Sequence, residues 1–414
     1  MLTGTNLHYA KSYNVRIVLE TIRLHGPLSR VEIARRTELT AQTVTNITRN
    51  LMKSNLVVEA ERIQDGRGAP SILLKINKEG AFSVGFDLDK DHLTAILVDL
   101  LGNIRQRIRY PLHFPSPDEA MVLLENTAKE LIQREQIPLD KIWGVGVGLP
   151  GPLAVTDGNI VKNVVNPIAL PGWSHVPVRD ILGKNLSLPV YLENNGSAAA
   201  IGELWYGAGR DKKTFFYVYF GSGLGGGVVI NGQPYSGNTG NAGELGYFPT
   251  PNENSTTGNA QRPHLGLYFN IPNLYQTLSS HGHTISTPSD LEELHRQKNE
   301  HLMAWIDKGA SEMAPIILAV EYLIDPKAIF FGGRLPESII NELLNKLKDS
   351  IPSMRIKEKT DAPELLIATS GWDAAALGAA TLPVYESLAP LPRVLMKNSG
   401  KTDRPLVPPA MIQS

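Results

Sequence analysis

The sequence predicts two parts of different fold class: an N-terminal winged helix-turn-helix and a two-lobed α/β body. The chain has 414 residues, more than one hydrophobic core normally serves, so we expect two or three domains. Residues 1–78 carry twelve Lys and Arg against six Asp and Glu, whereas the remainder has 28 basic and 35 acidic residues. A basic head suggests polyanion binding, although a solvated charged surface explains the charge equally well. After residue 79, strand and helix patterns run through the chain twice.

Composition excludes several classes of protein. The hydrophobic fraction of 42% and the charged fraction of 20% are typical of a globular chain. The absence of cysteine excludes disulfides, thiolate metal sites, iron–sulfur clusters and a cysteine nucleophile. No run of 18 apolar residues occurs, and the N-terminus lacks the pattern of a secretory signal. We therefore expect a cytoplasmic protein with no membrane partner.

Three helices are predicted in the head. Residues 15–24 place apolar side chains at helical spacing, and Gly26-Pro27 ends that helix. Ser29, with Glu32 three residues later, forms a capping box that opens a second helix. Residues 42–51 form a third, whose inner face is Val44, Ile47 and Leu51.

Two short strands, 55–59 and 71–76, flank a glycine-rich turn at 65–70 and complete a winged helix-turn-helix. The third helix would read DNA, because its outward side chains suit base edges and phosphates. The candidate DNA-binding residues are Gln42, Thr43, Thr45, Asn46 and Arg49, with Arg67 on the wing. The alternative is a helical protein-interaction module, but cap, turn, polar face and basic wing together favour DNA binding.

The sequence of the body predicts two α/β lobes. The first has apolar strands at 82–88, 93–99, 104–110 and 142–148 and an amphipathic helix at 117–135. The second opens with a hairpin at 215–220 and 227–230 and continues through helices to a buried strand at 328–331. The expected division is a head at 1–78, a first lobe at 79–195 plus about 378–391, a second lobe with the dimerisation surface at 196–377, and a loose tail at 392–414.

The segment 220–227 contains the spacing G-x-G-x-x-G after a strand. A dinucleotide-binding fingerprint requires a helix next, but Val228-Val229-Ile230 reads as another strand, so the Rossmann interpretation fails. A hairpin whose amides hold a phosphate, as in actin-like ATPases, is the better functional interpretation. A tight turn that simply needs glycine is the alternative.

Five short motifs follow one another along the body. They are Gly148-Leu149-Pro150-Gly151-Pro152, Asn166, Leu192-Glu193-Asn194-Asn195, Ala242-Gly243-Glu244-Leu245-Gly246 and Phe331-Gly332-Gly333. This ordered series resembles the ROK family of sugar kinases and sugar-responsive repressors. The likeness covers roughly residues 15–390 and implies an actin-like ATPase (sugar kinase-like) fold. The head is similar to that of the transcriptional repressor branch, which includes xylose and N-acetylglucosamine repressors.

Two departures from the family pattern argue against kinase activity. ROK kinases place an Asp base after Glu-Asn, and this chain has Asn195, whose amide cannot accept a proton. The first phosphate loop of the family is rich in glycine and threonine, but residues 87–92 here read Asp-Leu-Asp-Lys-Asp-His. Three acids in that loop would repel a triphosphate. We expect no enzyme activity, no catalytic residues and no cofactor.

A third departure concerns the structural zinc of the family. Tyr247 occupies the position of its His ligand, and the cysteine cluster is missing. We expect no metal site, and we expect His264, His281 and His283 to be surface histidines.

The resemblance also implies a sugar pocket, in which amides and carboxylates match vicinal hydroxyl pairs. Alternatively, Glu244 is a surface carboxylate and the Asn194-Asn195 pair a turn. Glu193 could orient its neighbours instead of touching the ligand. The candidate sugar-binding residues are Gly151, Asn166, Glu193, Asn194, Asn195, Glu244 and Tyr247.

These features predict a sugar-responsive transcriptional repressor of carbohydrate-metabolism genes. Its expected partners are operator DNA, a monosaccharide or phosphosugar effector, and further copies of the chain in a homodimer or dimer of dimers. The alternatives are a ROK sugar kinase with an appended DNA-binding head, and a repressor controlled by a protein partner such as a sugar-transport component.

Overall fold

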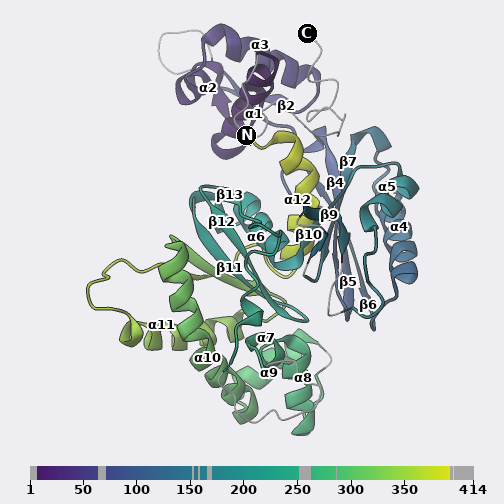
Figure 1. The fold of residues 1–414 in the computed structure, drawn as a ribbon. Helices are drawn as coiled ribbons and strands as arrows, with labels where there is room; N and C mark the ends of the chain where they lie inside the picture. The colour runs from purple at the N-terminus through teal and green to yellow at the C-terminus, as the bar shows by residue number, and fades with distance from the viewer. Residues whose placement is uncertain are drawn as a thin grey trace.

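The computed structural model describes residues 7–63, 71–151, 153–156, 159–165, 170–250, 263–285, 287–391 and 395. The expected wing turn at 65–70 lies outside this range, as does the expected tail apart from residue 395. Figure 1 shows a head at the top and two lobes below it, with helix α12 (Ala374–Leu388) running down from the head.

The head is a winged helix-turn-helix, as the sequence predicted. Its sheet has the order β1-β3-β2 and is antiparallel. Ser29 caps the second helix by accepting a hydrogen bond from the Glu32 amide at 3.2 Å, and Thr40 caps the third in the same way. The elements are α1 (Leu7–His25), β1 (Leu28–Ser29), α2 (Arg30–Thr37), α3 (Ala41–Lys53), β2 (Val57–Ile63) and β3 (Ser71–Ile76).

The two lobes contain five-stranded sheets with the same strand order. The first has the order β10-β7-β4-β5-β6 and the second β13-β12-β11-β14-β15. In each sheet, the first three strands along the chain pair as antiparallel neighbours. The fourth strand pairs in parallel with the first, and the fifth pairs in parallel with the fourth. The strands are β4 (Phe82–Leu88), β5 (His92–Asp99), β6 (Ile104–Pro111), β7 (Ile142–Leu149), β10 (Val190–Asn194), β11 (Phe215–Phe220), β12 (Leu224–Ile230), β13 (Gln233–Pro234), β14 (Ala328–Gly333) and β15 (Glu364–Ile367).

Helices cover both sheets. α4 (Pro117–Arg134) and α5 (Val178–Leu186) share a hydrophobic cluster with the first sheet, and α10 (Glu300–Ile324) and α11 (Glu337–Met354) share one with the second. α6 (Asn195–Tyr206) packs against α12, and the pair lies between the two sheets (Figure 1). The repeated topology confirms the predicted two-lobed, actin-like architecture.

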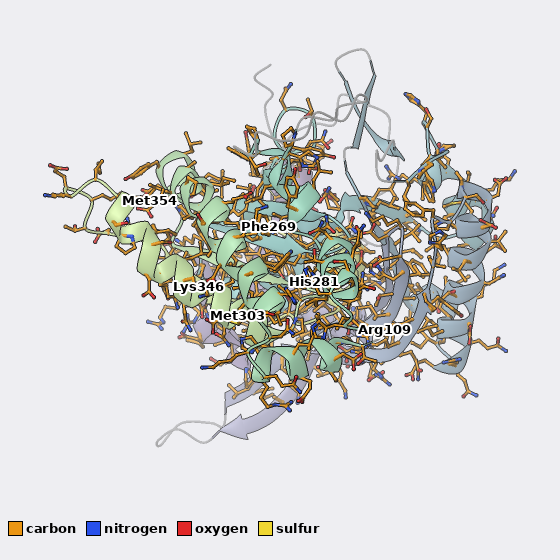
Figure 2. All side chains as sticks on the ribbon, turned by 90° about the horizontal axis from the view of Figure 1, so that it is seen from below. Arg109, Phe269, His281, Met303, Lys346 and Met354 are labelled. Carbon is orange, nitrogen blue, oxygen red and sulfur yellow. The ribbon has the colours of Figure 1, made fainter. Side chains whose placement is uncertain are left out.

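Smaller elements complete the description. Figure 2 is a view from below. It shows Lys346 and Met354 of α11 toward one side of the molecule and Arg109 of β6, in the first lobe, toward the other. Among the described residues, no helix is long and apolar enough to cross a membrane. The remaining elements are β8 (Leu153–Thr156), β9 (Asn159–Val165), α7 (Leu265–Tyr268), α8 (Ile271–Ser280), α9 (Pro288–Arg296) and the short 3₁₀ turns η1 (Lys78–Gly80), η2 (Leu139–Lys141), η3 (Ala208–Asp211) and η4 (Leu245–Tyr247).

Candidate functional site

A cavity of about 280 Å³ opens where strand ends of both lobes meet. The first lobe contributes the turn after β4, the turn after β7 and the junction between β10 and α6; the second contributes the β11–β12 turn. Five of the predicted sugar-binding residues line it: Gly151, Asn194, Asn195, Glu244 and Tyr247. Asn166 lies outside the described residues, and Glu193 is not part of the lining.

Glu244 and Asn194 form one polar wall of the cavity. A Glu244 carboxylate oxygen (Oε1) accepts a hydrogen bond from Asn194 Nδ2 at 3.2 Å. Burial raises the pKa of Glu244 to about 7, because the charged carboxylate loses hydration there. A side chain at Gly151 would overlap both groups, so glycine at this position keeps the wall open.

The turn from β10 into α6 fixes the two asparagines. Asn194 caps α6, with its Oδ1 accepting a hydrogen bond from the Gly196 amide at 2.8 Å. The Glu193 carboxylate accepts a hydrogen bond from the Asn194 amide at 3.0 Å. This hydrogen bond, made from outside the cavity lining, favours the orienting role over direct ligand contact for Glu193.

Asn195 is 4% exposed and faces carboxylates. Its Nδ2 donates to Asp87 at 3.0 Å and lies 3.5 Å from an oxygen of Asp89. Its Oδ1 is buried and has no hydrogen-bond partner among the described residues, which leaves one acceptor for a ligand hydroxyl. Such an amide orients a hydroxyl group without removing its proton.

The acidic loop after β4 is largely neutralised by its surroundings. His92 contacts Asp87 at 3.2 Å and Asp91 at 2.7 Å, and Arg334 contacts Asp91 at 3.0 Å. Burial alone would lower the pKa of His92, but the two carboxylates raise it to about 9. Burial likewise opposes ionisation of Asp91, but His92 and Arg334 hold its pKa well below the usual range.

Of the three acids in this loop, Asp87 and Asp91 pair with His92, and Asp89 is the one that lines the cavity, beside Lys90. Burial raises the pKa of Asp89. Repulsion of a triphosphate is therefore weaker than the loop composition suggests. The two carboxylates that contact His92 are close to it in the chain, but Arg334 follows directly after β14, which the local sequence could not indicate.

Tyr247 and His264 also line the cavity. Their rings lie 5.2 Å apart, and His264 Nδ1 is 2.9 Å from the carbonyl oxygen of Gly246. Tyr247 is 46% exposed, and burial together with Glu244 raises its pKa. His264 is half-buried and lines the cavity, so the expectation of a surface histidine was wrong for this residue. Its place depends on residue 264 pairing with Pro249 in an isolated β-bridge, which has no local sequence signal.

The residues present do not fit the zinc site implied by the family. The chain has no cysteine, and the Tyr247 ring packs at a tilt against the His264 imidazole instead of offering a nitrogen ligand. Asp89, Asp91 and His92 place ligand atoms within 4.8 Å of one another, the single such group in the described part of the chain. Arg334 and Asp87 already neutralise two of its members, so we assign no metal to it.

The predicted DNA-reading face is the solvent side of α3. Gln42, Asn46 and Arg49 are exposed on it, and Gln42 Nε2 lies 3.4 Å from Asn46 Oδ1. Thr43 and Thr45 are half-buried residues, and their hydroxyl groups bond locally, to the hydroxyl of the cap residue Thr40 and to the Ala41 carbonyl respectively. Gln42, Asn46 and Arg49 are therefore the predicted DNA-contacting residues of α3 whose side chains are exposed to solvent. Arg67 lies outside the described residues.

Comparison with known proteins identifies both parts. Residues 83–385 match the ROK family and residues 13–68 the MarR family. A xylose repressor of Bacillus spizizenii is 27% identical over 92% of this chain and 97% of its own length. The DNA-binding transcriptional dual regulator NagC of Escherichia coli is 26% identical over 59% of each chain.

Two solved structures support the fold. A ROK family transcriptional regulator, a homologue of the E. coli MLC protein, superposes with a TM-score of 0.74 over 92% of this chain and 98% of its own, at 20% identity. A ROK family glucokinase from Streptomyces griseus, solved with glucose and AMPPNP, superposes with a TM-score of 0.61 over 73% and 99%, at 21% identity. The first likeness includes the head, and the second matches about the length of the two lobes.

Proposed function

The chain belongs to the ROK family, and from this premise we propose that it is a sugar-responsive, DNA-binding repressor of carbohydrate-metabolism genes without kinase activity. The single observation that carries the proposal is the combination of an exposed reader helix with a sugar-sized polar cavity that holds Asn195 at the position of the family's base. The named repressor relatives support the same conclusion.

The cavity favours an uncharged monosaccharide as effector. Its polar lining includes Glu244, Asn194 and Asn195, which together offer both donors and acceptors to hydroxyl groups. Lys90 is the one lysine or arginine among the lining residues, and Asp89 lies beside it, so the described wall offers little to a phosphate. We further propose that α3 and Arg67 contact DNA and that a dimer presents two such heads.

The test is a thermal-shift panel of D-xylose, D-glucose, N-acetyl-D-glucosamine and their phosphorylated forms, each without and with ATP and Mg²⁺. A sugar present at 100 times its Kd raises the free energy of unfolding by ~2.7 kcal/mol. Glu244→Ala should lose the shift, and Glu292→Ala, on the outer helix α9, should keep it. Transfer of phosphate from ATP to any sugar of the panel would contradict the proposal.

A further inference from the structure

Helix α6 connects the cavity to the DNA-binding head. At its N-terminal end, the cap Asn194 and the first residue Asn195 both line the cavity. At its C-terminal end, the Trp205 carbonyl accepts a hydrogen bond from Arg23 Nη1 of α1 at 3.0 Å. The helix has 12 residues, so the two ends are ~18 Å apart along its axis.

The contact between Arg23 and Trp205 is built from several interactions. The Arg23 guanidinium carbon lies 4.2 Å from the centre of the Trp205 ring, and that ring is 3% exposed. The Nε and Nη2 atoms of Arg23 each donate to the Glu20 carboxylate at 2.7 Å. Because Glu20 fixes the plane of the guanidinium, a shift of Trp205 must displace α1 or break the contact.

A second contact joins the head to α12. Arg16 of α1 is 0% exposed, and its Nη1 donates to the carbonyl oxygens of Ala389 at 2.7 Å and Glu386 at 3.1 Å. These carbonyls belong to the C-terminal end of α12, where a cation is favoured. A side chain at Gly378 would overlap the backbone of Ala198, so α6 and α12 meet at backbone distance and have little freedom to slide.

α6 is also tied to the second lobe. The buried Glu203 carboxylate accepts hydrogen bonds from the amides of Thr369 at 3.0 Å and Ser370 at 2.9 Å. These residues belong to the connection between β15 and α12. A change in the arrangement of the lobes around the cavity therefore acts on α6 at both of its ends.

We propose that Arg23 and Trp205 are positioning residues that couple occupation of the cavity to the orientation of the head, through displacement of α6 as a rigid element. The inference rests on the proposed function only for the identity of the ligand. The coupling itself is a property of the contacts at the two ends of α6, and a change at the Asn195 end tests it without any ligand.

The experiment measures affinity for a duplex that the parent protein selects from a random pool. Asn195→Asp, measured at pH 8, removes the Nδ2 group that donates to Asp87 and Asp89 and sets a carboxyl group in its place, and the loss of these contacts should displace the start of α6. We expect this change to alter DNA affinity at least fivefold in the parent protein and less than twofold in the presence of Arg23→Ala. Arg134→Ala, which removes an arginine paired with Glu130 on the remote helix α4, is the matched control and should leave the fivefold effect intact.

A second arm uses the sugar of the panel that gives the largest thermal shift. Arg23→Ala should bind this sugar and the duplex with unchanged affinity, but the sugar should then change the affinity for DNA less than twofold. Arg23→Lys retains the cation and should restore part of the response. Unchanged affinity of Arg23→Ala for sugar and for DNA would exclude loss of folding as the cause of its weaker response. The inference would be overturned if Asn195→Asp did not change DNA affinity in the parent, or if its effect were equal with and without Arg23. Failure of every sugar to bind would contradict only the proposed function.

Discussion

Single residues carry the proposal that this cavity binds a sugar without reacting with it. Asn195 donates its amide to Asp87 and keeps one buried acceptor without a protein partner. Burial raises the pKa of the Glu244 carboxyl to about 7 and also raises that of Asp89, which lines the same cavity. Under the proposed function these polar groups bind sugar hydroxyls, while the amide of Asn195 cannot take up a proton.

The pKa of Glu244 predicts a specific dependence of stability on pH. The folded protein binds this proton up to about pH 7, whereas the unfolded chain releases it near pH 4.5, so stability falls as pH rises between these values. Glu244→Gln should remove a loss of roughly 3 kcal/mol at most across this window. The measurement is the difference in Tm between the variant and the parent from pH 4.5 to 8. A difference that does not vary with pH would show that the carboxyl titrates normally.

At the scale of elements, α3 is the part of the head whose role can be tested directly. Asn46 and Arg49 are exposed on it, and their side chains suit a base edge and a phosphate respectively. Asn46→Ala should weaken binding to the selected duplex by ~1–3 kcal/mol and spare random DNA. Arg49→Ala should weaken both and lower the salt dependence. Titrations at several salt concentrations distinguish the two, and equal losses of Asn46→Ala on both duplexes would reject base reading. Thr43→Ala is less informative, because that hydroxyl bonds to the cap residue Thr40.

Elements with a periodic pattern were predictable, and those fixed by distant contacts were not. The reader helix was expected at 42–51 and spans Ala41–Lys53, since Val44, Ile47 and Leu51 mark its buried face. The first helix begins at Leu7, well before the expected residue 15, because its first turns carry no apolar period. β1 has only two residues and exists through pairing with β3.

The same distinction holds within the site. Motif resemblance predicted the positions of Asn194, Asn195 and Glu244, all of which line the cavity. It missed His264 and Arg334, whose partners lie 18 and 243 positions away along the chain. It also could not reveal the contact of Arg23 with Trp205, since neither residue has a local pattern that requires the other.

At the scale of the whole molecule, head and body share one hydrophobic cluster. Val18, Leu19 and Ile22 of α1 belong to the same buried group as Trp205 of α6 and Leu388 of α12. The head is therefore packed against the elements that form the cavity, and is not joined to them by a linker alone. In a dimer, two reader helices must lie ~34 Å apart to meet successive turns of the major groove, so a small rotation of each head breaks the match.

This arrangement predicts reciprocal coupling between sugar and DNA. If a sugar lowers affinity for the duplex tenfold, the DNA-bound protein must bind that sugar tenfold more weakly, a coupling free energy of ~1.4 kcal/mol. Calorimetric titration of the sugar into free protein and into the saturated DNA complex measures both affinities. Arg23→Ala should bring the two values closer together, because the head then follows α6 only through apolar packing and the contact of Arg16 with α12. Arg134→Ala should keep them apart. A sugar Kd that is identical in the free and DNA-bound parent would show that this sugar does not act on DNA binding, because equilibrium binding energy cannot be transmitted in one direction only.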